Sequence, residues 1–153
     1  HSDSKYQVKN SIINKIFNEE KKLKLSDKKT FKNFIKEINT AKKELVKLLK
    51  KFKKQKKKTH CYGASTKGNV LLQYYKIDNK LIDAVAERNE NKYNLYTPGT
   101  KIKIISETLS RFNKPDYYLV LPWHFKKEIL KREHLIRSKG TKFIFPLPKL
   151  TIV

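Results

Sequence analysis

The sequence contains almost no sulfur, with a single cysteine, Cys61, and no methionine among its 153 residues. One cysteine excludes an internal disulfide and any zinc site built from several cysteines of this chain, and it is typical of a reducing compartment. No apolar run approaches the ~20 residues that cross a bilayer, and no signal-peptide pattern opens the chain. We therefore expect a soluble, cytoplasmic protein with no membrane partner and no metal site of its own. Because methionine is absent and the chain opens on His1, we also expect a fragment of a longer protein.

Arginine is scarce too, although the chain is strongly basic. There are 4 arginines against 33 lysines, and the formal net charge is +23. Arginine is the residue best suited to hydrogen-bond base edges and phosphates. In this sequence the positive charge is also spread along the chain and does not form one patch. Biased use of lysine explains the charge more simply than a nucleic-acid partner does. The densest run, Lys50–Lys58, is interpreted as a helix C-terminus, where lysines complement the helix dipole.

The first third of the chain predicts two amphipathic helices. Apolar residues recur at helical spacing over residues 6–24, and Ser26 with Asp27 supplies an N-cap for a second, longer helix that reaches Phe52. Lysines fill the positions between the apolar ones, so each helix has one apolar face. We expect residues 1–56 to form a helical segment that packs on, or links to, a domain over residues 57–153.

The remaining residues alternate between short apolar runs and helical patterns. Strands are predicted at 59–62, 82–86, 102–105, 117–121 and 142–145. Helices are predicted after the first, third and fourth of these, the last of them over 125–138, and Pro146 and Pro148 are expected to end regular structure. This alternation predicts an α/β fold, a Rossmann-like, doubly wound, five-stranded parallel sheet preceded by the two amphipathic helices. Ligands of such sheets bind beyond the carboxyl ends of the strands.

The segment His60–Asn69, HCYGASTKGN, is the most informative stretch. It predicts a strand, a tight turn at Gly63 and a helix whose N-terminus favours an anion such as a phosphate. The spacing is neither GxGxxG nor the P-loop pattern, because Lys67 precedes the second glycine. The alternative is an ordinary strand-to-helix turn in which Ser65 and Thr66 cap the helix.

Polar residues at three strand ends complete a candidate substrate site. Lys67 and Ser65 are the candidates for a pyrophosphate, Glu87 for a ribose hydroxyl and Arg88 for a phosphate. No catalytic residue is predicted, since nothing adjacent orients His124 and Cys61 has no evident partner. The candidate substrate-binding residues are Tyr62, Gly63, Ala64, Ser65, Thr66, Lys67, Gly68, Asn69, Glu87, Arg88, Asn89, Tyr96, Trp123 and His124. Each also has a structural alternative as a turn, cap, packing or surface ion-pair residue.

Five separated motifs make the sequence recognisable. CYGASTKGNVLLQYY, AERN, LYTPGT, PDYYLVLPWHF and GTKFIFPLP follow one another in this order. Together they resemble the C-terminal domain of the SAM-dependent nucleotide-sugar C-methyltransferases, which methylate C-3 of deoxysugars. The resemblance runs from about Ser11 to the end of the chain.

The resemblance implies an enzyme of three domains. A zinc-binding domain comes first, a middle domain binds S-adenosylmethionine and holds the catalytic base, and the third, Rossmann-like domain helps to anchor the nucleotide sugar. Only the third is expected here, so this fragment would be inactive alone and would bind neither zinc nor S-adenosylmethionine. Its expected partners are a nucleotide sugar, taken to be dTDP-linked, and the rest of the parent enzyme.

Two alternatives from other functional classes stay open on the sequence. Glu87 favours an NAD-binding domain of an oxidoreductase, which the missing GxGxxG opposes. The net charge favours a basic nucleic-acid-binding module, which the scarcity of arginine and the absence of a reader motif oppose.

Overall fold

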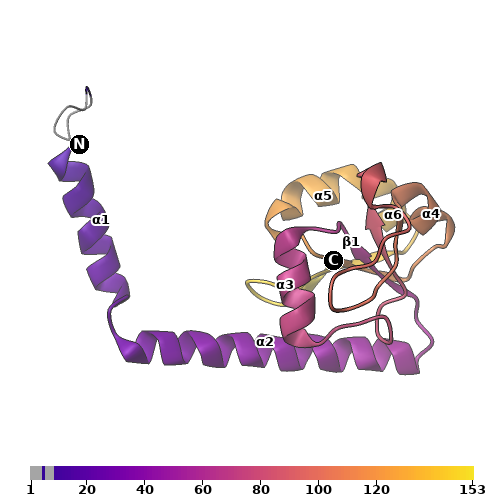
Figure 1. The fold of residues 1–153 in the computed structure, drawn as a ribbon, viewed down its shortest axis with the longest axis horizontal. Helices are drawn as coiled ribbons and strands as arrows, with labels where there is room; N and C mark the ends of the chain where they lie inside the picture. Colours follow the sequence, from indigo (N-terminus) through magenta and orange to yellow (C-terminus); the bar gives the residue numbers. More distant parts are fainter. Residues whose placement is uncertain (1–4, 6–8) are drawn as a thin grey trace. The chain divides into compact units, whose positions relative to one another are not determined.

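A computed structural model describes residue 5 and residues 9–153, and the described residues divide into two units, one that ends at Asn39 and one over Thr40–Val153 (Figure 1). The first unit contains α1 (Asn10–Leu23) and the beginning of α2 (Lys28–Lys54). Residues 6–8 of the first predicted helix lie outside the described residues. The predicted cap of the second helix is confirmed, since Asp27 Oδ1 accepts a hydrogen bond from the Lys29 N–H at 2.8 Å. Whether residues 1–56 are a separate domain stays a prediction.

The second unit is built on a six-stranded sheet in the order β3-β2-β1-β4-β5-β6. Its strands are β1 (Thr59–Tyr62), β2 (Ala84–Glu87), β3 (Ile104–Ser106), β4 (Tyr117–Val120), β5 (Lys142–Phe145) and β6 (Thr151–Ile152). The first five are parallel, and Cys61 on the central strand lies opposite Val85 and Leu119. The predicted Rossmann-like α/β fold is thereby confirmed.

The predicted number of strands, five, was too low. After Pro146 and Pro148 the chain turns back, and β6 pairs with β5 in the antiparallel direction. Phe143 and Val153 exchange two backbone hydrogen bonds of 2.9 and 3.0 Å. An antiparallel neighbour needs only a short connection, so two prolines in that connection do not prevent another strand.

The helix predicted over 125–138 is interrupted. The structure has a 3-10 turn, η2 (Trp123–Phe125), followed by α5 (Lys126–Arg132) and α6 (His134–Ser138). The break falls at Glu133, whose φ and ψ of −97° and 23° are not helical. The side chain of Glu133 is buried and takes part in an ion-pair network described below. A periodicity of apolar residues does not reveal such a break.

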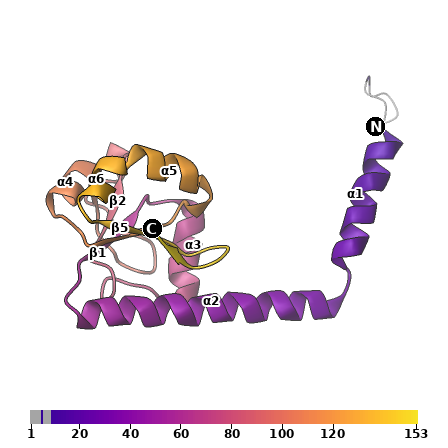
Figure 2. The ribbon, with the colours of Figure 1, turned by 180° about the vertical axis from the view of Figure 1, so that it is seen from behind.

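Helices cover both faces of the sheet (Figures 1 and 2). On one face, Ser110 of α4 (Glu107–Phe112) contacts His60, and Glu133 between α5 and α6 contacts Tyr62. On the other face, Phe52 of α2 stacks on Tyr117 with ring centroids 3.8 Å apart. The Lys42 ammonium of α2 donates to the carbonyl of Tyr74 in α3 (Thr66–Tyr75), which places α3 beside α2.

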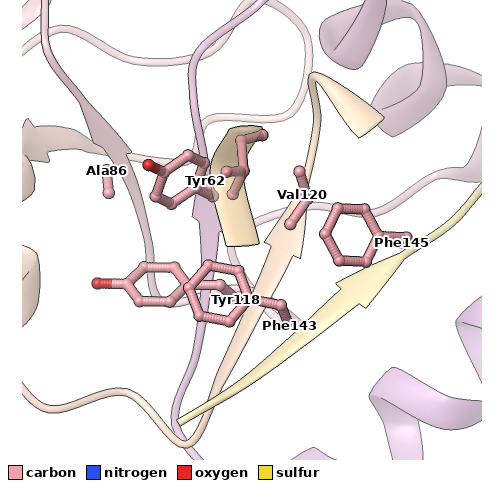
Figure 3. Close-up of a cluster of buried hydrophobic side chains, with 7 residues drawn as sticks. Tyr62, Ala86, Tyr118, Val120, Phe143 and Phe145 are labelled. Carbon is pink, nitrogen blue, oxygen red and sulfur yellow. The ribbon is translucent and has the colours of Figure 1, made fainter. Parts of the chain in front are cut away.

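An aromatic cluster fills the space under α4, α5 and α6. The rings of Tyr62, Tyr118 and Phe143 come from three adjacent strands, with centroids between 5.3 and 5.9 Å apart. Figure 3 shows that the hydroxyls of the two tyrosines leave this cluster on the same side. The cluster therefore fixes two polar groups at a defined position beneath the helices, because buried hydroxyls must find partners.

Candidate functional site

A cleft of about 500 Å³ opens at the carboxyl ends of β1, β2 and β4. It lies where the chain order of the sheet reverses, with β1 between β2 and β4, the position at which doubly wound sheets bind ligands. Six of the predicted residues line it: Tyr62, Gly63, Ala64, Ser65, Glu87 and Arg88. Seven further lining residues come from other loops and helices: Lys92, Glu107, Pro122, Phe125, Glu128, Ile129 and Arg132.

The turn between β1 and α3 is tightly packed. Gly63 has a φ of +80°, in the region that favours glycine, and a Cβ there would lie 3.1 Å from Pro122 Cδ. Ser65 is the N-cap of α3, and its Oγ accepts a hydrogen bond from the Gly68 N–H at 3.1 Å. A Cβ on Gly68 would lie 2.3 Å from Leu121 Cβ. The second glycine of the motif therefore allows α3 to pack closely against the chain that follows β4.

Glu87 holds the loop that follows β2 against this turn. Its carboxylate accepts hydrogen bonds from the N–H groups of Ala64, Arg88 and Asn89 at 2.7, 2.9 and 3.0 Å. The Lys92 ammonium lies 3.8 Å from the same carboxylate and donates to the Ala64 carbonyl at 3.0 Å. Burial opposes ionisation of Glu87, but the backbone hydrogen bonds outweigh it and lower its pKa. Glu87 is thus ionised and engaged by the protein itself.

A network of charges forms the opposite wall of the cleft. The carboxylate of Glu133, 2% exposed, accepts hydrogen bonds from the Tyr62 hydroxyl at 2.7 Å and from Arg111 and Arg132 at 2.9 Å each. Glu107 joins the same two arginines, with Arg111 at 3.1 Å and Arg132 also in contact. The Arg132 guanidinium also donates to the Tyr62 hydroxyl and lies over the Tyr62 ring, 5.2 Å from its centroid. Burial raises the pKa of Glu107, although Arg111 opposes the shift.

The other predicted residues lie outside the lining of the cleft. These are Thr66, Lys67, Gly68, Asn69, Asn89, Tyr96, Trp123 and His124. Thr66 and Lys67 are exposed at the start of α3, and Tyr96 is 60% exposed. Trp123 packs against the aromatic cluster, and the His124 ring lies 4.3 Å from that of Phe125. Asn69 differs from the rest because its Oδ1 is buried without a hydrogen-bond partner.

Cys61 lies in the centre of the sheet, fully buried, and burial raises the pKa of its thiol. A buried thiol with a raised pKa is unreactive. Among the described residues, no group of three or more His, Cys, Asp or Glu side chains is placed to hold a metal ion. Within the same part of the chain, no helix is both long and apolar enough to span a bilayer.

A larger open groove, about 1170 Å³, runs along α2 between Lys42 and Gln55. Seven lysines line it beside apolar residues such as Leu81 and Leu150. Its polar lining consists mainly of lysines, and it lies away from the strand ends that bind ligands in this fold. The cleft at β1 and β4 is therefore the better candidate site.

The sequence interpretation missed the arginine and glutamate network. Helical periodicity places Glu107, Arg111 and Arg132 on two separate helices and gives no reason to bring them together. One signal was present: with only 4 arginines among 37 basic residues, the position of each arginine is informative. Arg88 and Arg132 line the cleft, and Arg111 lies directly behind its wall.

Comparison with known proteins identifies relatives of this chain. The sequence pattern of the family described as C-methyltransferase C-terminal domain matches residues 1–148. The C-methyltransferase NovU of Streptomyces niveus is 33% identical over 92 residues, which make up 60% of this chain and 22% of that protein. The match therefore spans about a fifth of the relative's length.

Proposed function

Because the chain belongs to the C-methyltransferase C-terminal domain family, we propose that it anchors a nucleotide-linked sugar in an enzyme that methylates a carbon of that sugar. The methyl donor in this proposal is S-adenosylmethionine, and the nucleotide is dTDP. The donor site, the catalytic base and a zinc-binding domain are proposed to belong to other parts of the parent enzyme. The proposed location is the cytoplasm.

The observation that supports this proposal is the cleft at the point where the sheet order reverses. The β1–α3 turn, the start of the loop after β2 and helix α5 all contribute to its wall. It offers the backbone of the turn, two arginines and Lys92 to a polar ligand, and Phe125 and Ile129 to an apolar one. A concave site with a few charged groups on an apolar floor suits a nucleotide carrying a sugar.

The contacts of Glu87 oppose a dinucleotide or S-adenosylmethionine site of the usual kind. In that kind of site, an acidic residue at the end of the second strand accepts a hydrogen bond from a ribose hydroxyl. Here the acid accepts three backbone hydrogen bonds and lies beside Lys92, and a carboxylate accepts about four. These contacts favour nucleotide-sugar binding over an NAD-dependent oxidoreductase domain. We propose that Glu87 positions the loop that carries Arg88.

Nuclear magnetic resonance of the 18.2 kDa chain tests the proposal directly. Titration with dTDP should shift the amide signals of Gly63, Ala64 and Arg88, while those of Asn113 and Lys103 at the opposite edge stay in place. NAD and a short DNA duplex at the same ionic strength serve as controls, because charge alone binds all three ligands to a basic protein. Equal, salt-sensitive shifts with all three would reject nucleotide-sugar anchoring in favour of unspecific charge binding.

A further inference from the structure

Three of the 4 arginines lie at the cleft or directly behind its wall, in a chain with 33 lysines. Arg88 and Arg132 line the cleft. Arg111 lies behind the wall and contacts Glu107 and Glu133. Arginine differs from lysine in its planar fork of five N–H donors, which suits carboxylates and phosphates. The three side chains therefore indicate a site that needs directed donors and more than positive charge alone.

Arg132 is held in place from behind while part of it faces the cleft. Its Nε donates to Glu133 and its Nη2 to Tyr62 and Glu107. Among the described residues, its Nη1 has no hydrogen-bond partner, and the side chain is 37% exposed. The buried Glu133 thus fixes Nε, and a ligand anion can use Nη1 together with the Nη2 that Glu107 now occupies.

Glu107 occupies the cleft beside that guanidinium. Its two oxygens are divided between Arg132 and Arg111. If Arg132 were taken by another anion, Glu107 would keep Arg111 as a partner, and Glu133 would keep both Tyr62 and Arg111. The exchange would leave no buried charge without a partner, so its cost in free energy is small.

We propose that Arg132, assisted by Arg88, binds a phosphate of the ligand in the cleft. In the absence of a ligand, the Glu107 carboxylate occupies the position of that phosphate beside Arg132, and the phosphate displaces it. This inference rests on the proposed function. It differs from the prediction that Lys67 holds the pyrophosphate, because Lys67 lies outside the lining. Of the three acids that line the cleft, Glu87, Glu107 and Glu128, Glu107 is the one that forms an ion pair with Arg132, so a ligand anion at Arg132 must compete with Glu107 first.

Removing the competing acid should therefore tighten anion binding. Glu107→Gln keeps an acceptor for Arg111 and removes the charge, and we expect it to bind inorganic pyrophosphate about tenfold more tightly than the unmodified chain. Glu128→Gln is the matched control, because it removes the same charge from the same cleft at a residue with no ion pair among the described residues. Its effect should stay within about twofold, as expected for a screened surface charge.

Arg132→Gln and Lys67→Ala distinguish the two possible anion contacts. We expect Arg132→Gln to weaken the binding of pyrophosphate and of dTDP about tenfold and to leave the binding of thymidine almost unchanged. Lys67→Ala should change the affinity for each of the three ligands by less than about twofold. Isothermal titration measures the affinities, and thermal melts confirm that each variant folds. Arg132→Lys is the second variant if Arg132→Gln does not fold, and it should weaken pyrophosphate because its single ammonium cannot replace the fork.

The outcomes separate this inference from the proposed function. If dTDP binds at the cleft but neither Glu107→Gln nor the Arg132 variants change its affinity relative to thymidine, the inference is wrong and nucleotide anchoring stands. If Glu107→Gln tightens pyrophosphate while dTDP binds no better than pyrophosphate, the anion contact is supported and the nucleotide role fails. If Lys67→Ala alone weakens pyrophosphate, the anion binds at the start of α3 and the inference is overturned.

Discussion

Acidification should destabilise this protein through His60, a buried histidine outside the lining of the cleft. The ring is 2% exposed, and its Nδ1 lies 2.8 Å from Ser110 Oγ, which in turn lies 2.7 Å from the Tyr118 hydroxyl. Burial lowers the pKa of His60 to about 4, with Lys58 acting in the same direction and Asp83 opposing it. The folded protein therefore holds the neutral ring, whereas the unfolded chain takes up a proton near pH 6.5.

The sign and size of the effect follow from proton linkage. Between pH 6.5 and about 4 the unfolded state binds the additional proton, so the free energy of unfolding falls as the pH falls. From pH 7.5 to pH 5 the loss amounts to ~2 kcal/mol, given 1.36 kcal/mol per pKa unit. For a chain of 153 residues this lowers the melting temperature by about 6 °C.

Thermal melts of the protein and of His60→Gln between pH 7.5 and 5 provide the assay. The substitution removes the titrating group, so the melting temperature of the variant should fall by much less over this range. The pKa values of Glu87 and Asp116 are lowered by their partners, so their contribution to the free energy of unfolding is lost only at a pH near or below 4.5. This loss is common to both proteins. Parallel curves for the two proteins would refute the reasoning, whatever their absolute stabilities.

Three further predictions concern the packing of Gly68, the reactivity of Cys61 and the binding of S-adenosylmethionine. Gly68→Ala should lower the free energy of unfolding by about 1–3 kcal/mol in urea titrations, because its Cβ would overlap Leu121, whereas Lys67→Ala on the same turn should have little effect; equal stability would contradict the packing role. Cys61 should not react with a thiol reagent until denaturant is added, since it is buried with a raised pKa, and fast labelling of the native protein would contradict this. The chain alone should neither bind S-adenosylmethionine nor transfer its methyl group, and calorimetry showing micromolar binding would reject that proposal.

The sheet could be predicted because its strands are buried on both faces. Runs such as Tyr117–Leu121 are continuously apolar, and the segments between them are long enough for parallel crossovers. β6 was missed because it has only two residues, Thr151–Ile152, and follows two prolines. Its pairing depends on the edge that β5 offers, a tertiary feature that has no periodicity in the sequence.

The cleft could be predicted in part for a similar reason. The carboxyl ends of parallel strands meet at one edge, so Tyr62 and Glu87 were expected to lie together, and they do. Whether either touches a substrate stays a prediction. The opposite wall comes from helices, and Arg132 contacts Glu133 at the break between α5 and α6, which only the folded protein reveals.

The break at Glu133 and the use of arginine have a common physical explanation. A carboxylate that is 2% exposed is costly unless several donors surround it, and continuing the helix would compete with that arrangement. Arg111 and Arg132 each contact Glu107 and Glu133 together, which a flexible lysine with one ammonium does less well. A chain that uses lysine at 33 of 37 basic positions thus places two of its 4 arginines where two acids must be held together. Fixed donors of this kind orient an anion, and exposed lysines elsewhere supply only a diffuse attraction.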